Sequence, residues 1–244
     1  MDHTHTHKAY EPKMEHTNKR YEDELSTLST RLTQMGELVV AQLESALRSF
    51  AEHDIRAART IIDRDIEVNR MDIELEELCL QLLALNQPAA RDLRLVATAM
   101  MTATELERLG DRVVNVCEEV TERDADDSIP ADDEVLRMGA LAVAMVRAGI
   151  EAFSKTDRFA VARVMEMDKE FDALYSEAFP RIVTSLAKDP ERIARDTKLA
   201  FLAKDLNEIS EHATNIAEMV MFMLDGKEIT HMDMHERRTN KIGV

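Results

Sequence analysis

The sequence predicts an all-α protein made of two tandem, pseudo-symmetric three-helix bundles, and three observations lead to this fold class. The chain of 244 residues contains 6 Gly and 5 Pro, too few for a turn-rich β protein. Strong helix formers such as Ala, Leu, Glu, Arg and Met are abundant. Apolar residues recur at helical spacing over six long segments.

A long internal repeat divides these six segments into two halves. The segment 35–69 returns 103 residues later, so that Asp65 corresponds to Asp168. Further along the chain, 106–118 returns as 206–218, which is 100 residues later. This period is far longer than the roughly 20–50 residues of a solenoid repeat. One domain-sized unit is therefore used twice, and a site in one half has a pseudo-symmetric partner in the other.

The first bundle is expected over 21–124 and contains three helices. The first helix, over 21–51, and the second, over 54–85, both carry an apolar residue at every third or fourth position. Pro88 separates the second helix from the third, which is expected over 89–123. Proline suits the start of a helix, where its missing N–H costs nothing.

An acidic linker over 125–133 joins the halves, and the second bundle is expected over 134–226. Asp132 and Asp133 are candidate N-caps for the helix that follows the linker. The second bundle should repeat the plan of the first, with helices over 134–153, 157–187 and 190–224. The polar segments 1–20 and 227–244 lack periodicity, so a disordered tail is expected at the N-terminus and another tail at the C-terminus.

Charge and composition exclude several classes of partner and compartment. A net charge of −17 argues against nucleic-acid binding, because phosphates attract Lys and Arg. No apolar run reaches the roughly 18 residues of a membrane span, and the N-terminus has no apolar signal segment. The two cysteines, Cys79 and Cys117, provide no disulfide framework. A reducing, cytoplasmic location is therefore expected.

Acidic helix faces are the main candidate site in the first half. Residues spaced by three or four lie on one face of a helix. On the second expected helix these residues are Asp65, Asn69, Asp72 and Glu76, and on the third they are Glu107, Asp111 and Asn115. The turn at 86–88 folds the third helix back along the second, so the two faces can meet. Carboxylates from two helices suit a hard cation such as Mg, Mn or Fe.

The second half repeats this face in altered form. The fifth expected helix carries Asp168 and Asp172, and the sixth carries Glu211 beside His212. Solvated helix faces with i,i+4 salt bridges would show the same spacing, because 32% of the residues are charged. The return of Asp65 as Asp168 favours a constrained site over such a surface.

Enzymatic motifs are absent from the sequence, so we expect a protein that is not an enzyme. There is no GxxxxGK[ST], GxGxxG or GxSxG pattern. A metal-dependent helical-bundle enzyme stays open as an alternative, although the second and third helices lack the Glu-x-x-His pairs of di-iron proteins. A metal-free structural adaptor is a third interpretation.

Two motifs connect the chain with a known family. The stretch 87–96 (QPAARDLRLV), followed by 106–112 (LERLGDR), resembles the QPxAxDLR and ERIGD patterns of the PhoU family of phosphate-uptake regulators. The resemblance covers about residues 25–228. It implies two three-helix bundles packed side by side, with E/DxxxD motifs that bind metal ions in some members.

The resemblance also implies site residues and a regulatory role. The residues expected to hold a metal ion (Mg, Mn, Fe or Zn) are Asp65, Asn69, Glu107, Asp111, Asp168, Asp172 and Glu211. Asn207 stands where the family has a Glu, so the second site lacks one negative ligand. Members of the family are cytoplasmic negative regulators that connect the ATPase subunit of the phosphate ABC transporter with a sensor histidine kinase. We expect the same partners here, and a homodimer.

Overall fold

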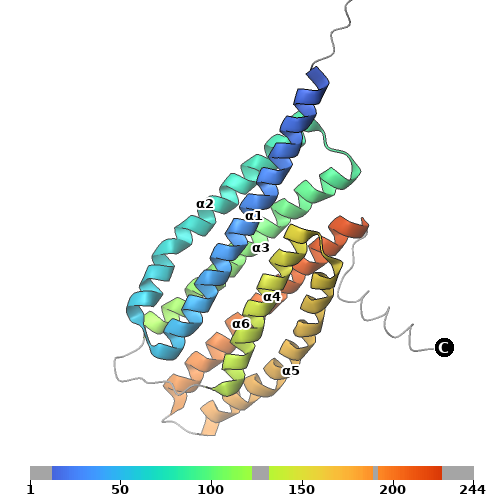
Figure 1. The fold of residues 1–244 in the computed structure, drawn as a ribbon. Helices are drawn as coiled ribbons and strands as arrows, with labels where there is room; N and C mark the ends of the chain where they lie inside the picture. The colour runs from blue at the N-terminus through green and yellow to red at the C-terminus, as the bar shows by residue number, and fades with distance from the viewer. Residues whose placement is uncertain (1–12, 123–131, 189–191, 227–244) are drawn as a thin grey trace, which may run out of the picture.

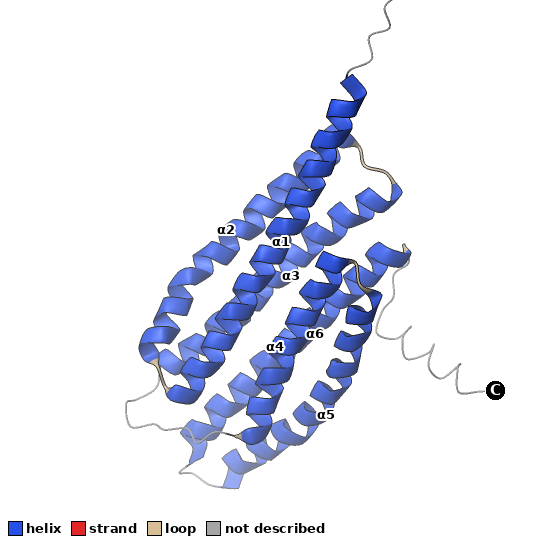
Figure 2. Cartoon of the chain, viewed as in Figure 1, coloured by secondary structure: helices blue, strands red, loops and turns tan. Residues whose placement is uncertain are grey.

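The computed structural model confirms the all-α architecture and describes residues 13–122, 132–188 and 192–226 (Figures 1 and 2). The first bundle consists of α1 (Lys13–Glu52), α2 (Ile55–Asn86) and α3 (Ala90–Thr121). The second consists of α4 (Asp133–Lys155), α5 (Arg158–Lys188) and α6 (Ile193–Asp225). The long rods lie side by side, as helices with lengthwise apolar stripes require.

Helix α1 begins earlier than the sequence indicates. It starts at Lys13, so residues 13–20, which we expected to belong to a disordered tail, are helical. Apolar periodicity fades before Tyr21, but the segment contains good helix formers, and an Arg20–Glu24 ion pair of 2.9 Å links successive turns. The predicted tails 1–12 and 227–244 and most of the linker lie outside the described residues.

Capping side chains fix the starts of two helices, and one of them, Asp132, is an N-cap candidate that the sequence indicated. Asp54 accepts hydrogen bonds from the backbone N–H groups of Arg56 and Ala57, both at 3.0 Å, and so begins α2. Asp132 accepts a bond from the backbone N–H of Val135 at 3.3 Å and begins α4. These caps satisfy backbone donors that a helix leaves without a partner in its first turn.

The core is continuous through both bundles. Buried apolar side chains from all six helices form one cluster, in which Leu106 and Phe171 are fully buried. The bundles meet where α3 packs on α6 and α1 packs on α4. Among the described residues, α2 and α5 contact only helices of their own bundle. The two outermost helices in Figure 1 are therefore α2 and α5.

The internal repeat reappears as a pseudo-twofold axis between α1 and α4. Ile150 packs against Gly36, and Leu47, which precedes Ile150 by 103 residues, packs against Gly139. An ion pair of 2.7 Å joins Glu44 to Arg147, which are themselves 103 residues apart. Residues in equivalent positions of the two halves therefore meet each other, as they do at the axis of a symmetric dimer.

Replacing Gly36 with alanine should destabilise the protein by about 1–2 kcal/mol, although alanine in a helix normally gains up to about 1 kcal/mol over glycine. A methyl group there would lie 2.5 Å from Cδ1 and 2.7 Å from Cγ1 of Ile150. At the equivalent Gly139 it would lie 3.1 Å from the flexible tip of Leu47, so the same change should be nearly neutral.

Urea unfolding of the two alanine variants measures this difference. Adding Ile150→Val to Gly36→Ala should cost less than the sum of the two single changes, because it removes the nearest clashing atom. Equal destabilisation at both glycines would contradict the packing described for this interface.

None of the helices in the described part of the chain combines the length and the apolar character that crossing a membrane requires.

Candidate functional site

The predicted acidic faces of α2 and α3 come together in the first bundle. Asn69 donates a hydrogen bond to Oδ2 of Asp65 at 3.0 Å, one turn away on α2. Gly110 on α3 lets Asp65 approach closely, because a methyl group at that position would lie 3.0 Å from Oδ1 of Asp65. The glycine of the LERLGD motif therefore makes room for a carboxylate of the neighbouring helix.

The carboxylates of this cluster influence one another's ionisation. Burial is the main reason that the pKa of Asp65 is raised; the hydrogen bond from Asn69 opposes this shift and the charge of Asp111 adds to it. Burial also raises the pKa of Glu107, and the charges of Asp111, Asp72 and Asp65 raise it further. The charge of Asp111 contributes to both shifts, so a cation would relieve repulsion between these carboxylates.

Two buried oxygen atoms in the cluster lack hydrogen-bond donors. Oδ1 of Asp65 and Oδ1 of Asn69 have no partner among the described residues. Buried acceptors are usually satisfied, and hard cations prefer carboxylate and amide oxygens. The donor chemistry therefore fits a hard cation. However, among the described residues no three or more His, Cys, Asp or Glu side chains are gathered as a metal site requires.

The equivalent residues of the second bundle are satisfied by other side chains. Asp168 is buried, and its Oδ1 lies 3.1 Å from the hydroxyl of Thr214, which acts as a donor. Glu211 accepts a hydrogen bond from Asn207 at 2.7 Å. Asp172, the remaining predicted ligand, is exposed on α5. Asp168 and Glu211 therefore both have hydrogen-bond donors, whereas Oδ1 of Asp65 in the first bundle has none among the described residues.

A buried polar network joins α3 to α6, and sequence reasoning did not find it. Glu105 on α3 is 6% exposed. Its Oε2 lies 2.6 Å from Nδ1 of His212 and 3.2 Å from the amide nitrogen of Asn215, both on α6. Burial alone would raise the pKa of Glu105, but these two hydrogen bonds and the charges of His212 and Arg108 outweigh it and lower the pKa.

The repeat generates a reciprocal contact from α6 to α3. Asp205, which is equivalent to Glu105, accepts a hydrogen bond from Asn115 at 3.4 Å and lies 4.0 Å from Arg112. Arg112 is closer to Glu208, at 2.9 Å. The negative charge of Asp205 therefore has weaker hydrogen bonds and ion pairs than that of Glu105. Burial raises the pKa of Asp205 to about 6. One sequence signal for this pair of contacts was available: Asn115 is repeated as Asn215, 100 residues later.

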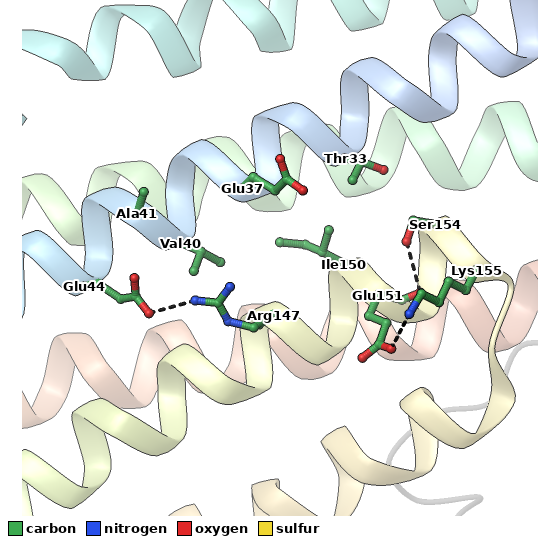
Figure 3. Close-up of a pocket in the computed structure, with 10 residues that line it drawn as sticks. All are labelled: Thr33, Glu37, Val40, Ala41, Glu44, Arg147, Ile150, Glu151, Ser154 and Lys155. Carbon is green, nitrogen blue, oxygen red and sulfur yellow. Dashed lines mark hydrogen bonds and ion pairs between the residues drawn. The ribbon is translucent and has the colours of Figure 1, made fainter.

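A groove of about 380 Å³ lies between α1 and α4 (Figure 3). Val40 and Ile150 line it together with the ion pair between Glu44 and Arg147. Glu151 is bound by Lys155 at 2.9 Å. Because these charges largely neutralise one another, the groove offers an apolar lining and not an ion site.

Comparison with known proteins gives a consistent result for both halves of the chain. The sequence profile of the PhoU domain matches residues 32–120 and 135–220. A phosphate-specific transport system accessory protein PhoU homolog from Xylella fastidiosa strain 9a5c is 34% identical over 214 residues, covering 88% of this chain and 90% of that protein. The homolog from Pseudomonas aeruginosa is 30% identical over 226 residues, covering 90% and 91%.

Two solved structures share the fold. The crystal structure of PhoU from Pseudomonas aeruginosa superposes with a TM-score of 0.81 at 30% identity, over 85% of this chain and 100% of that one. The phosphate transport system regulatory protein PhoU from Streptococcus pneumoniae superposes with a TM-score of 0.79 at 26% identity, over 86% and 99%. The whole two-bundle arrangement is therefore shared, and not only the single bundle.

Proposed function

The chain belongs to the PhoU family, and from this premise we propose that it acts as a regulatory accessory protein of a phosphate-specific transport system. The observation that carries the proposal is the match of both halves, 32–120 and 135–220, to the PhoU domain. Relatives that are similar over about nine-tenths of this chain bear the name of phosphate-specific transport system accessory proteins.

In the finer form of this proposal, the chain is a cytoplasmic, non-enzymatic adaptor. It binds the ATPase subunit of the phosphate transporter and a sensor histidine kinase, and it keeps the phosphate-starvation response off when phosphate is plentiful. A net charge of −17 supports docking onto basic patches of these partners. Long-range attraction of this kind speeds association and weakens as salt rises.

A hard divalent or iron-type cation is part of the proposal for the first bundle. Asp65, Asn69, Glu107 and Asp111 would hold it, because two buried oxygens there lack donors, and because burial and the charge of Asp111 raise the pKa of both Asp65 and Glu107. A bound cation would supply positive charge that neutralises this cluster. The carboxylates would have to move closer to share one ion, since they are not gathered into a metal site.

The second bundle would bind a cation more weakly. Asp168 already has a hydrogen-bond donor, and Asn207 replaces a carboxylate while donating to Glu211. The two halves would then play unequal parts, with the first bundle as the cation-binding half.

Deleting the gene for this chain should leave phosphate-starvation genes expressed in phosphate-rich medium, because the proposed brake on the kinase is lost. Transcript levels with and without a plasmid copy of the chain measure the effect. Normal repression in the deletion strain, once any second family member is also deleted, would contradict the regulatory role.

A binding experiment tests the electrostatic part separately. Binding of the chain to the purified kinase domain should weaken between about 50 and 150 mM salt, where the Debye length shortens to about 8 Å. Binding that does not depend on salt would contradict docking by charge but would leave the regulatory role in place.

A further inference from the structure

The outer face of α2 carries a row of exposed apolar side chains. Ile66, Ile73 and Leu80 are 72%, 57% and 52% exposed. They are spaced by seven residues and therefore lie on one side of the helix, as at a seam between two packed helices. Single exposed apolar residues need no explanation, but a row of them marks an interaction surface.

The row is not a requirement of the fold. Helix α5 occupies the equivalent outer place in the second bundle. The α5 residues that follow Ile66, Ile73 and Leu80 by 103 positions are Lys169, Ser176 and Val183. Two of the three are polar there. Val183 is 44% exposed, but the equivalents of Ile66 and Ile73 are polar, so the fold does not require a complete row of exposed apolar side chains on its outer helices.

We propose that this face of α2 is the surface through which two copies of the chain associate, with their α2 helices antiparallel and centred on Ile73. The inference rests on the homodimer expected for this protein and specifies its interface. In this arrangement Ile73 meets Ile73 of the second copy. Ile66 and Leu80 lie seven residues on either side of Ile73. Ile66 of one copy therefore faces Leu80 of the other copy, and Leu80 of the first copy faces Ile66 of the other.

The charges beside the row match this direction. Arg70 lies three residues before Ile73 and Glu77 four residues after it, on the same edge of the row. Antiparallel pairing brings Arg70 of each copy against Glu77 of the other, giving two reciprocal ion pairs. Within the chain, Arg70 contacts Glu74 at 3.9 Å, a long ion pair that leaves its guanidinium able to reach across.

Helix α2 is also long enough and open enough for this role. Its 32 residues form a rod of about 48 Å. Among the described residues it contacts only α1 and α3, so the opposite side faces outward. The row lies at the centre of this rod, where an antiparallel pair would bury the greatest area on both copies.

Cross-linking tests the centre of the interface. The full chain with Ile73→Cys should form a disulfide-linked dimer under mild oxidation, and the matched change Ser176→Cys on α5 should not. The native Cys79 and Cys117 will not interfere, because burial raises the pKa of each thiol to about 12. Equal cross-linking at both positions would overturn the proposal.

Charge reversal tests the pairing. Arg70→Glu and Glu77→Arg should each weaken the dimer roughly tenfold. Each change turns both reciprocal ion pairs of the dimer into pairs of like charges. The double variant should recover most of the affinity in analytical ultracentrifugation. Circular dichroism should be the same in all three, since both side chains are exposed. Failure of the double variant to recover would overturn the antiparallel pairing.

The outcomes separate this inference from the homodimer itself. If the unmodified chain is a dimer but the Ile73→Cys variant does not cross-link, the interface lies elsewhere and only the assignment of the surface fails. If the unmodified chain is a monomer at all concentrations tested, both fail. If the kinase domain protects the introduced thiol of that variant from labelling while the chain is a monomer, the row is a docking surface for that partner, and the present proposal is wrong.

Discussion

Replacing Glu105 with alanine should lower the free energy of unfolding by about 3 kcal/mol, a large fraction of the stability of a typical domain. The change removes the one carboxylate that His212 and Asn215 both contact in the interface between α3 and α6. Both partners would then be left with unsatisfied polar groups in a largely buried place, at about 1–3 kcal/mol each at most. Urea unfolding monitored by circular dichroism measures the loss.

Two variants control this experiment. Glu105→Gln keeps an acceptor for Asn215 and should lose less than alanine. Asp205→Asn, at the equivalent position of the second bundle, should be almost neutral at pH 7.5, because the charged form of Asp205 is poorly compensated there. A loss below about 1 kcal/mol for Glu105→Ala would show that the network contributes little beyond packing.

The pH dependence of the Asp205 control has a definite sign. The pKa of Asp205 is about 6 in the folded protein and 3.8 ordinarily, so the folded state binds this proton more tightly than the unfolded state does. Lowering the pH from 7.5 to 5 should therefore stabilise the protein through this group, by about 1 kcal/mol. Asp205→Asn should remove that part of the gain.

The double change Glu107→Ala and Asp111→Ala should release any cation held by the first bundle, because it removes both carboxylates that α3 contributes. Elemental analysis of protein purified without chelator or affinity tag measures the metal content. In metal-free protein the same change should leave stability unchanged or slightly raised. The reason is that burial and then the neighbouring negative charges raise the pKa of Glu107, so the ionised form of this carboxylate is disfavoured in the folded protein.

The second bundle supplies the matched comparison. The equivalent double change, Asn207→Ala and Glu211→Ala, should alter metal content much less, since Asn207 already replaces a carboxylate there. Asn207→Glu should instead increase binding in the second half. Metal content that is unchanged by the double variant in the first bundle would place the cation elsewhere in the protein.

The fold was predictable because its signals are local and repeated. Apolar periodicity, the proline at Pro88 and the cap candidate Asp132 place five of the six helix starts within three residues of the structure. The start of α1 was missed because residues 13–20 are helical but lack the periodic apolar residues on which the prediction relied.

The candidate site was predictable only as far as helix faces are. Spacing along α2 and α3 put Asp65 and Glu107 on facing surfaces, and the structure places Asp65 close enough to add to the rise that burial causes in the pKa of Glu107. Spacing could not tell which side of α3 meets α6, so the role of Glu105 was invisible. It also could not show that the hydroxyl of Thr214 would satisfy Asp168, because that depends on packing between two separate helices.

The ion pair between Glu44 and Arg147 has a consequence for how the two halves can be combined. In a true homodimer a residue on the symmetry axis meets its own copy, so a charged residue there always faces its like. Joining both copies in one polypeptide removes that restriction, and the equivalent positions can hold opposite charges. Two first halves placed together would set Glu44 against Glu44, and two second halves would set Arg147 against Arg147. The covalent duplication thus makes the halves complementary and no longer interchangeable, which gives a pseudo-symmetric molecule two sides that a partner protein can tell apart.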